Sequence, residues 1–134
     1  MEKKNIDWSS IGFGYMPTDY RYVSNFKDGK WDEGTLTEDP NVVINECAGI
    51  LQYCQECFEG LKAYTTEDGS IVTFRPDLNA ERMMDSCARL EMPQFPKERF
   101  MEALDKVVKA NEAWVPPYGS GATLYIRPYM FASG

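Results

Sequence analysis

The chain has 134 residues, of which 43% are hydrophobic and 26% charged, so it can bury a core as a single domain, 1–134. Its net charge of −7 argues against a nucleic acid partner, since nucleic acids attract basic surfaces. No apolar run reaches the length of a transmembrane helix, so no membrane partner is expected. The absence of histidine removes the commonest general base and metal ligand.

Two Asp-Gly pairs predict antiparallel hairpins, because these residues readily adopt the positive φ angles of tight turns. The first pair, at 28–29, lies between extended runs within residues 20–34. The second, at 68–69, lies between extended runs within residues 58–75. Between the hairpins we expect a short extended run and one helical turn near Leu51.

The apolar period changes to that of a helix after the second hairpin. Residues 76–93 place Met83, Cys87 and Leu90 on one helical stripe, with Asn79 as the expected N-cap and Pro93 as the stop. A second and clearer helix begins near Lys97, where apolar residues recur at Phe100, Leu104, Val107 and Val108.

A glycine loop then leads into a last strand, Thr123 to Tyr129. The order hairpin, hairpin, two helices and strand predicts an α+β fold. It is a two-layer sandwich in which two principal helices cover one face of a mainly antiparallel sheet.

Tyr125 and Arg127 share one face of the last strand, because alternate residues of a strand point the same way. A phenol and a guanidinium placed in this way suit a carboxylate ligand. The alternative is an aromatic and cationic ladder on a solvated sheet face.

Arg82 falls in the first turn of its helix if Asn79 is the cap. A cation at this position opposes the helix dipole, so its placement is slightly unfavourable unless an anion lies nearby. A phosphate is the natural candidate for that anion. The alternative is a solvated arginine paired with Glu81 or Asp85.

Lys62 lies in a half-apolar strand and could serve as a Schiff-base nucleophile. We favour the alternative, a surface lysine beside Glu59 or Glu67. Gly60 in the same strand indicates a close backbone approach. The residues alone therefore predict anion-binding spots without a complete catalytic set.

Four cysteines in a chain without an export signal predict reduced thiols and a cytoplasmic location. Cys54 and Cys57 form a C-x-x-C pair, which could indicate redox chemistry or half a zinc site. Zinc needs further ligands that the sequence does not offer, so we expect no metal and semi-buried free thiols. A thiol-redox or zinc module stays as an alternative.

Three motifs in order, FEGLKAY (58–64), FRPDLNAERM (74–83) and LYIRPYMF (124–131), resemble the branched-chain amino acid aminotransferases. These are class IV (fold-type IV) enzymes that depend on pyridoxal 5'-phosphate. The resemblance implies that the chain is the N-terminal half of such an enzyme. A C-terminal domain, absent here, would then supply the lysine that holds the cofactor, so no residue of this chain is catalytic and the chain alone is inactive.

The resemblance also implies residue roles. Arg82 matches the position that binds the cofactor phosphate. Tyr125 and Arg127 match a Tyr-x-Arg pair that faces the substrate carboxylates. The aromatic positions that line the family's pocket for an apolar substrate side chain correspond to Phe13, Tyr53 and Phe58. Lys62 does not match the lysine that holds the cofactor, and Cys54 and Cys57 match no family motif.

The implied activity is reversible transfer of the amino group from leucine, isoleucine or valine to 2-oxoglutarate. The implied partners are small amino acids and 2-oxo acids, and a second copy of the enzyme in a homodimer. A D-amino acid aminotransferase or an aminodeoxychorismate lyase of the same fold is an alternative. A stand-alone module that binds an anionic small molecule without catalysis is another.

Overall fold

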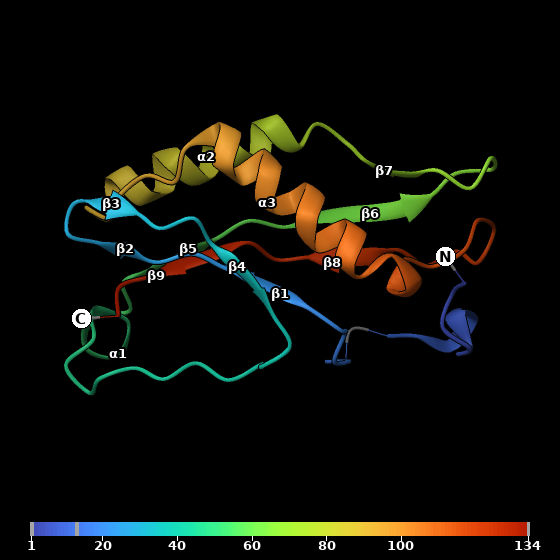
Figure 1. Ribbon diagram of the computed structural model, residues 1–134, viewed down its shortest axis with the longest axis horizontal. Coiled ribbons are helices and arrows are strands. Elements are labelled where there is room, and N and C mark those ends of the chain that lie inside the picture. The colour runs from blue at the N-terminus through green and yellow to red at the C-terminus, as the bar shows by residue number, and fades with distance from the viewer. Residues whose placement is uncertain (1, 13, 134) are drawn as a thin grey trace.

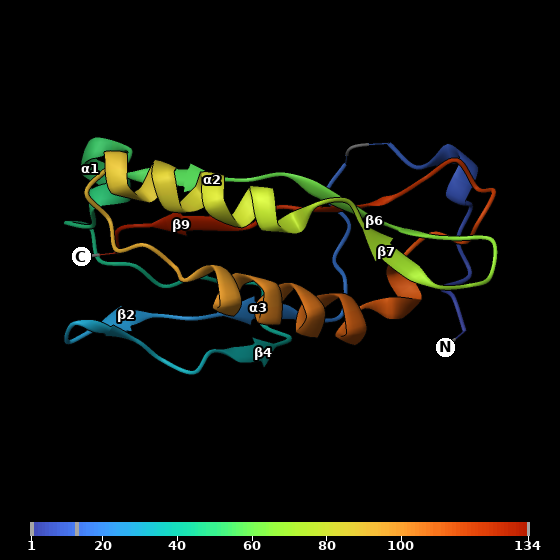
Figure 2. The same cartoon turned by 90° about the horizontal axis from the view of Figure 1, so that it is seen from above.

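Two long helices form one layer of the molecule and short strands form the other (Figure 1). The computed structural model describes residues 2–12 and 14–133. The helices are η1 (Trp8–Ser10), α1 (Gly49–Tyr53), α2 (Pro76–Arg89), α3 (Lys97–Ala110) and η2 (Glu112–Trp114). Seen from above, α2 and α3 lie side by side over the strands (Figure 2). No helix in the described ranges is long and apolar enough to cross a membrane.

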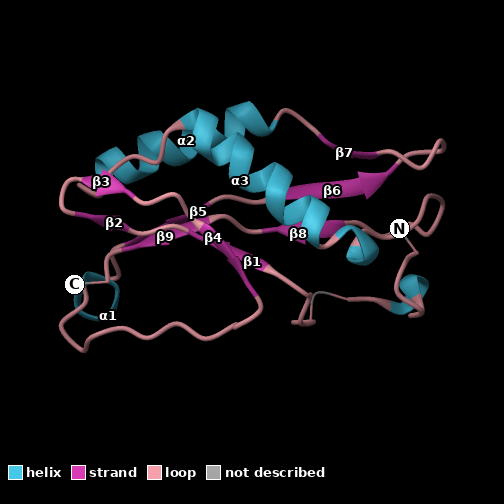
Figure 3. Cartoon of the chain, viewed as in Figure 1, coloured by secondary structure: helices cyan, strands magenta, loops and turns pink. Residues whose placement is uncertain are grey.

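The strands pair only antiparallel within the described residues, and they form four small sheets (Figure 3). The outer pairs are β1 (Arg21–Val23) with β4 (Thr35–Thr37), and β2 (Phe26–Lys27) with β3 (Lys30–Trp31). The central pairs are β5 (Glu56–Phe58) with β9 (Tyr129–Phe131), and β6 (Leu61–Thr65) with both β7 (Ile71–Thr73) and β8 (Leu124–Ile126). The predicted α+β two-layer arrangement is confirmed, and the expected sheet is divided into small pieces.

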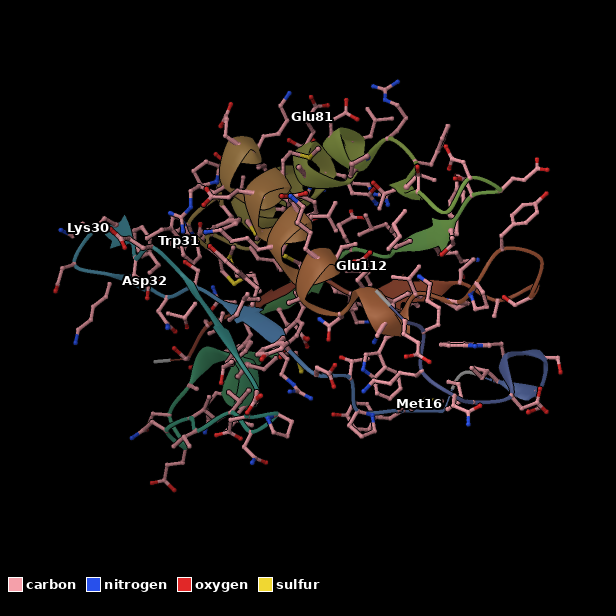
Figure 4. The ribbon with its side chains drawn as sticks, turned by 45° about the vertical axis from the view of Figure 1, so that its right-hand side comes forward. Met16, Lys30, Trp31, Asp32, Glu81 and Glu112 are labelled. Carbon is pink, nitrogen blue, oxygen red and sulfur yellow. The ribbon has the colours of Figure 1, made fainter. Side chains whose placement is uncertain are left out.

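Both predicted hairpins are present. Asp28 and Gly29 have φ angles of 55° and 82°, which suit a tight turn between β2 and β3. This hairpin is held to the rest of the fold by Trp31, which is labelled in Figure 4. The centre of its ring lies 5.0 Å from the centre of the Phe95 ring. Trp31 Nε1 also donates a hydrogen bond of 3.0 Å to the Gln94 carbonyl.

The last strand is interrupted, which corrects the expectation of one strand from Thr123 to Tyr129. β8 ends at Ile126 and β9 begins at Tyr129, because Pro128 has no N–H to donate to a ladder. The Pro128 carbonyl still accepts a hydrogen bond of 2.8 Å from the Glu59 N–H. The register is the same on both sides of the break. The pair of β5 with β9 and the pair of β6 with β8 therefore form one continuous ladder, called the central ladder below.

α2 begins earlier than predicted. Its N-cap is Arg75, which takes the left-handed conformation with φ 45°, and Pro76 occupies the first helical position. Proline is favoured there because its fixed φ suits the helix and its missing N–H would be unpaired anyway. Asn79 is therefore not the cap, and Arg82 lies in the second turn rather than the first. The dipole argument for an anion at Arg82 does not hold.

The core lies between α2, α3 and the central ladder. Its main cluster consists of Ala80, Met83, Cys87, Met92 and Phe100. Leu90, expected on the buried stripe of α2, is instead 37% exposed at the C-cap.

The end of α3 is tied to the N-terminal segment by one buried side chain. Asn111 Oδ1 accepts a hydrogen bond of 2.8 Å from the Tyr20 N–H, and its Nδ2 donates one of 2.9 Å to the Tyr20 carbonyl. The chain leading into β1 is thereby fixed against the helical layer.

Candidate functional site

The central ladder has an apolar inner face and a more exposed outer face. Residues directly opposite each other in an antiparallel pair share a face, and alternate residues along a strand point the same way. The inner face turns toward the helices and buries Glu59, Leu61 and Ala63. The outer face carries Phe58, Gly60, Lys62, Tyr125, Arg127 and Tyr129. Three of the residues predicted for the site therefore lie on one surface.

Arg127 lies against two aromatic rings of this surface. Its guanidinium carbon is 4.6 Å from the centre of the Phe58 ring and 5.5 Å from that of the Tyr125 ring. Cations are attracted to the faces of such rings, which restrains the guanidinium without using its N–H groups. Within the described part of the chain, those N–H groups make no side-chain hydrogen bond or ion pair. They remain available to a carboxylate, for which a guanidinium fork is well suited.

Gly60 leaves the space that the Tyr125 side chain occupies. A Cβ atom built on Gly60 would lie 2.5 Å from Tyr125 Oη and 3.1 Å from the nearest ring carbons. Any other residue would displace the phenol. The close backbone approach that the sequence indicated at Gly60 is thus present, and it is made by Tyr125.

Arg82 forms an ion pair with Glu59 rather than with Glu81 or Asp85. Its Nε and Nη2 donate to Oε1 and Oε2 of Glu59, which is only 5% exposed. The hydrogen bonds from Arg82 hold the pKa of the Glu59 carboxyl below its usual value, although burial acts in the opposite direction. Glu81 pairs instead with Lys97 at 3.1 Å; it lies at the top of Figure 4.

Asn79 completes the arrangement around Glu59. Its Nδ2 donates to Glu59 Oε2 at 3.1 Å and to the Gly60 carbonyl at 3.2 Å. The contacts of Glu59 with Arg82 and Asn79 therefore lie next to the outer-face residues, because Asn79 also reaches the Gly60 backbone against which Tyr125 packs. No direct contact joins Arg82 to Arg127 among the described hydrogen bonds and ion pairs.

An open surface hollow of 370 Å³ lies beside the Gly60 backbone. Its lining consists of Gly60, Leu61, Lys62, Tyr64, Phe74, Asn79 and Thr123. Lys62 is exposed and lies opposite Tyr125 in the ladder, so the expectation of a surface lysine is confirmed. Of its two expected neighbours, Glu59 is bound to Arg82, and the described ion pairs include none between Lys62 and Glu67.

Of the two remaining aromatic residues predicted for the site, the structure describes Tyr53. Tyr53 ends α1, is 83% exposed, and has no ring contact with Phe58, Tyr125 or Arg127 among the described aromatic contacts. Phe13 lies outside the described residues.

The cysteines do not form a C-x-x-C unit in space. Cys57 Sγ lies 3.4 Å from Cys87 Sγ on α2, whereas Cys54 is exposed at the C-cap of α1. All four thiols are free. Within the described ranges, no group of three or more cysteines and carboxylates could hold a metal ion.

The chain is similar to known aminotransferases, although no family model matches it. It is 55% identical over 131 residues to a branched-chain-amino-acid aminotransferase of Haemophilus influenzae and 44% identical over 131 residues to one of Helicobacter pylori. Each match covers 98% of this chain. The chain corresponds to the N-terminal part of these aminotransferases. It spans 38% of the length of both relatives.

The fold agrees with this relationship. A solved branched-chain amino acid aminotransferase, in complex with N-(5'-phosphopyridoxyl)-L-glutamate, matches with a TM-score of 0.60 and 26% identity. That match covers 74% of this chain and 30% of the solved chain. The fold is also that of a branched-chain aminotransferase of the archaeon Thermoproteus uzoniensis, with a TM-score of 0.59 over 84% of this chain and 34% of the solved one, at 24% identity. The resemblance drawn from the three motifs is confirmed.

Glu59 and Asn79 were not recognised as site residues from the sequence. The signal was present for Glu59, because the alternation Cys57, Glu59, Leu61, Ala63 puts a carboxylate on the apolar face of a strand. A buried carboxylate needs a cation, and Arg82 was available.

Proposed function

We propose that the chain is the N-terminal domain, 1–134, of a pyridoxal-phosphate-dependent branched-chain aminotransferase. The enzyme moves the amino group of leucine, isoleucine or valine to 2-oxoglutarate. The observation that carries the proposal is the cluster of Phe58, Tyr125 and Arg127 in a chain that is 55% identical to such an aminotransferase.

The Arg127 cluster suits both kinds of substrate. The N–H groups of Arg127 would bind the side-chain carboxylate of glutamate or 2-oxoglutarate, and the Tyr125 hydroxyl would donate to a second carboxylate oxygen. Phe58 is 55% exposed and offers an apolar wall to a branched aliphatic chain. From the resemblance alone, we also assign Tyr53 and Phe13 to the apolar pocket of the full enzyme. One surface thereby accepts an apolar side chain or a carboxylate.

Arg82 would hold the phosphate of the cofactor. Its side chain is 68% exposed, and the N–H groups not used by Glu59 lie on the free edge of the guanidinium. This arrangement fits a phosphate, which accepts such forks readily. When bound, pyridoxal 5'-phosphate withdraws electrons from the substrate Cα, while this chain binds and orients the substrate around it.

The remaining parts of the enzyme are assigned to regions outside this chain. We propose that a second domain supplies the lysine that holds the cofactor, that the enzyme is a cytoplasmic homodimer, and that the 134-residue chain alone has no transaminase activity. A clear transamination rate from the purified chain would contradict the last statement.

The cofactor role can be tested by trapping. The chain is incubated with pyridoxal 5'-phosphate, reduced with borohydride, digested and analysed by mass spectrometry. Scattered, low-level labelling of several lysines is expected. Near-complete labelling of Lys62 alone would mean that this domain holds the cofactor covalently itself, and the assignment of that role to a second domain would be wrong.

Substrate recognition can be tested separately by nuclear magnetic resonance. Addition of 2-oxoglutarate to the ¹⁵N-labelled chain is expected to shift the Arg127 side-chain signal, and Arg127→Gln should abolish the interaction. Arg99→Gln is the control, because Arg99 lies on α3 and bonds to the Asp32 carbonyl at 2.7 Å. An unchanged Arg127 signal at saturating 2-oxoglutarate would reject the carboxylate role.

A further inference from the structure

Glu59 is a charged residue in an apolar position. It lies on the inner face of the ladder between Cys57 and Leu61, and only 5% of its surface is exposed. A carboxylate in such a place is costly unless it is paired and hydrogen-bonded. Two side chains of α2 provide this, Arg82 and Asn79. The ladder therefore carries a fixed negative charge directed toward α2.

The ion pair with Glu59 uses only one edge of the Arg82 guanidinium. Glu59 occupies Nε and one N–H of Nη2, so both N–H groups of Nη1 and the second of Nη2 have no part in the ion pair. These groups include the end-on fork, the edge that binds two oxygens of a phosphate at once. The side chain is 68% exposed, so this fork is open to a ligand.

The carboxylate is itself held in place. Asn79 Nδ2 donates one hydrogen bond to Glu59 Oε2 and the other to the Gly60 carbonyl, which anchors the carboxylate to the backbone of the ladder. A long arginine side chain has many rotamers, and a contact along its Nε edge removes most of them. Glu59 thus fixes the plane and the direction of the guanidinium.

We propose that Glu59 is the positioning residue for Arg82 and that it presents the end-on fork to a phosphate ligand. The identity of that phosphate as the one of pyridoxal 5'-phosphate rests on the proposed function. A competing role is that Glu59 acts as a rival anion that weakens phosphate binding. The geometry favours positioning, because Glu59 occupies the side edge and leaves the end-on fork to the ligand.

The test compares Glu59→Gln, which keeps the shape and removes the charge, with Glu81→Gln. Glu81 is a matched control because it is an exposed carboxylate of α2 whose partner is Lys97. The first readout is the ¹H–¹⁵N signal of Arg82 Nε in the ¹⁵N-labelled chain. We expect slow solvent exchange of this proton in the wild type and in Glu81→Gln, and fast exchange in Glu59→Gln. Equal exchange in all three proteins would overturn the inference.

The second readout is phosphate affinity, followed on the same Arg82 signal. Inorganic phosphate and pyridoxal 5'-phosphate are the probes, and pyridoxal, which lacks the phosphate, is the negative control. We expect Glu59→Gln to weaken binding of both phosphates about tenfold, because the freed side chain must be ordered again by the ligand. Tighter binding in Glu59→Gln would identify Glu59 as a rival anion and overturn the inference. Weakening for pyridoxal 5'-phosphate alone would support the positioning role with the cofactor phosphate as the ligand, whereas unchanged affinity for both phosphates would overturn it.

A titration of the wild type avoids any folding defect of the variants. As pH falls, the Glu59 carboxyl carbon signal and the Arg82 Nε signal should change with one common midpoint, because protonation of Glu59 releases the guanidinium. Separate midpoints would overturn the inference. Absence of any phosphate binding to the wild type would also overturn it, whereas the substrate role of Arg127, measured with 2-oxoglutarate, tests the proposed function independently.

Discussion

The guanidinium carbon of Arg127 lies 4.6 Å from the centre of the Phe58 ring, although the two residues are far apart in the sequence. The single register of the central ladder causes this contact. Phe58 pairs with Tyr129 on one side of the break and Leu61 pairs with Ile126 on the other, so Arg127 projects from the same face as Phe58. The strand pairing therefore brings together the three residues that we propose bind a carboxylate, Phe58, Tyr125 and Arg127.

Replacement of Phe58 by leucine should release Arg127 with little effect on stability. Cation–π contacts at exposed sites contribute about 0.5–1 kcal/mol, so urea unfolding should show a loss of that order. The Arg127 side chain should become more mobile, which ¹⁵N relaxation of its Nε signal measures. Phe74→Leu is the control, because Phe74 is 78% exposed. An Arg127 signal that is unchanged by Phe58→Leu would show that the ring does not restrain it.

Alanine at position 60 should displace Tyr125. The new Cβ would lie 2.5 Å from Tyr125 Oη, so the phenol must move away from the ladder. Affinity for 2-oxoglutarate should fall about tenfold if Tyr125 supplies one hydrogen bond to the ligand. The matched control is Gly12→Ala, where nothing lies within 4 Å of the added atom. Wild-type affinity in Gly60→Ala would show that the Tyr125 position is unimportant for binding.

Truncation of Phe100 should destabilise the domain strongly. Phe100 is 4% exposed and belongs to the main core cluster between α2 and α3. A Phe→Ala change at such a site costs about 3–5 kcal/mol in the free energy of unfolding. Leu78→Ala, at a position that is 49% exposed on α2, should cost less than about 1 kcal/mol. Similar urea midpoints for the two variants would contradict the assigned core.

The cysteines should differ in their reactivity toward iodoacetamide. Cys47 and Cys54 are exposed and should be alkylated first in the native protein. Burial, with a hydrogen bond to Cys57, raises the pKa of the Cys87 thiol to about 12, so its reactive thiolate is scarce. Mass spectrometry of timed samples checks the order, and urea-unfolded protein should label at all four positions. Labelling of native Cys87 as fast as Cys54 would contradict its burial.

The ion pair of Glu59 and Arg82 should make stability depend on pH in the acid range. The folded state lowers the pKa of Glu59 from its ordinary 4.5, first through the hydrogen bonds of Arg82. A lowered carboxyl pKa contributes stability that is complete above the ordinary value and is lost as pH falls through the folded value. The stability difference between the wild type and Arg82→Met should therefore be largest near neutral pH and shrink below pH 4.5.

Urea unfolding of both proteins at a series of pH values measures this difference. Lys97→Met is the control, because it removes the exposed ion pair between Lys97 and Glu81. Such an exposed pair adds little to stability at any pH. A difference between the wild type and Arg82→Met that stays constant into the acid range would mean that the pair adds no stability.

Local sequence signals predicted the elements well where the physical cause is itself local. The Asp28-Gly29 turn and the apolar stripe of α3 are properties of neighbouring residues, and both are present as expected. The start of α2 was predicted at Asn79, because its side chain is a good N-cap. The structure uses Pro76 as the first helical residue, which frees the Asn79 side chain to bind Glu59.

The sequence by itself determined the two-layer α+β fold and the shared face of Tyr125 and Arg127. It also carried the relationship to branched-chain aminotransferases through three motifs in order. These follow from periodicity, turn chemistry and the residue order along one chain. Only the tertiary structure decided the partners of the charged and sulfur-bearing side chains. Arg82 meets Glu59 and Cys57 meets Cys87 because strand pairing and helix packing join distant segments, and each buried group takes the partner that this packing offers.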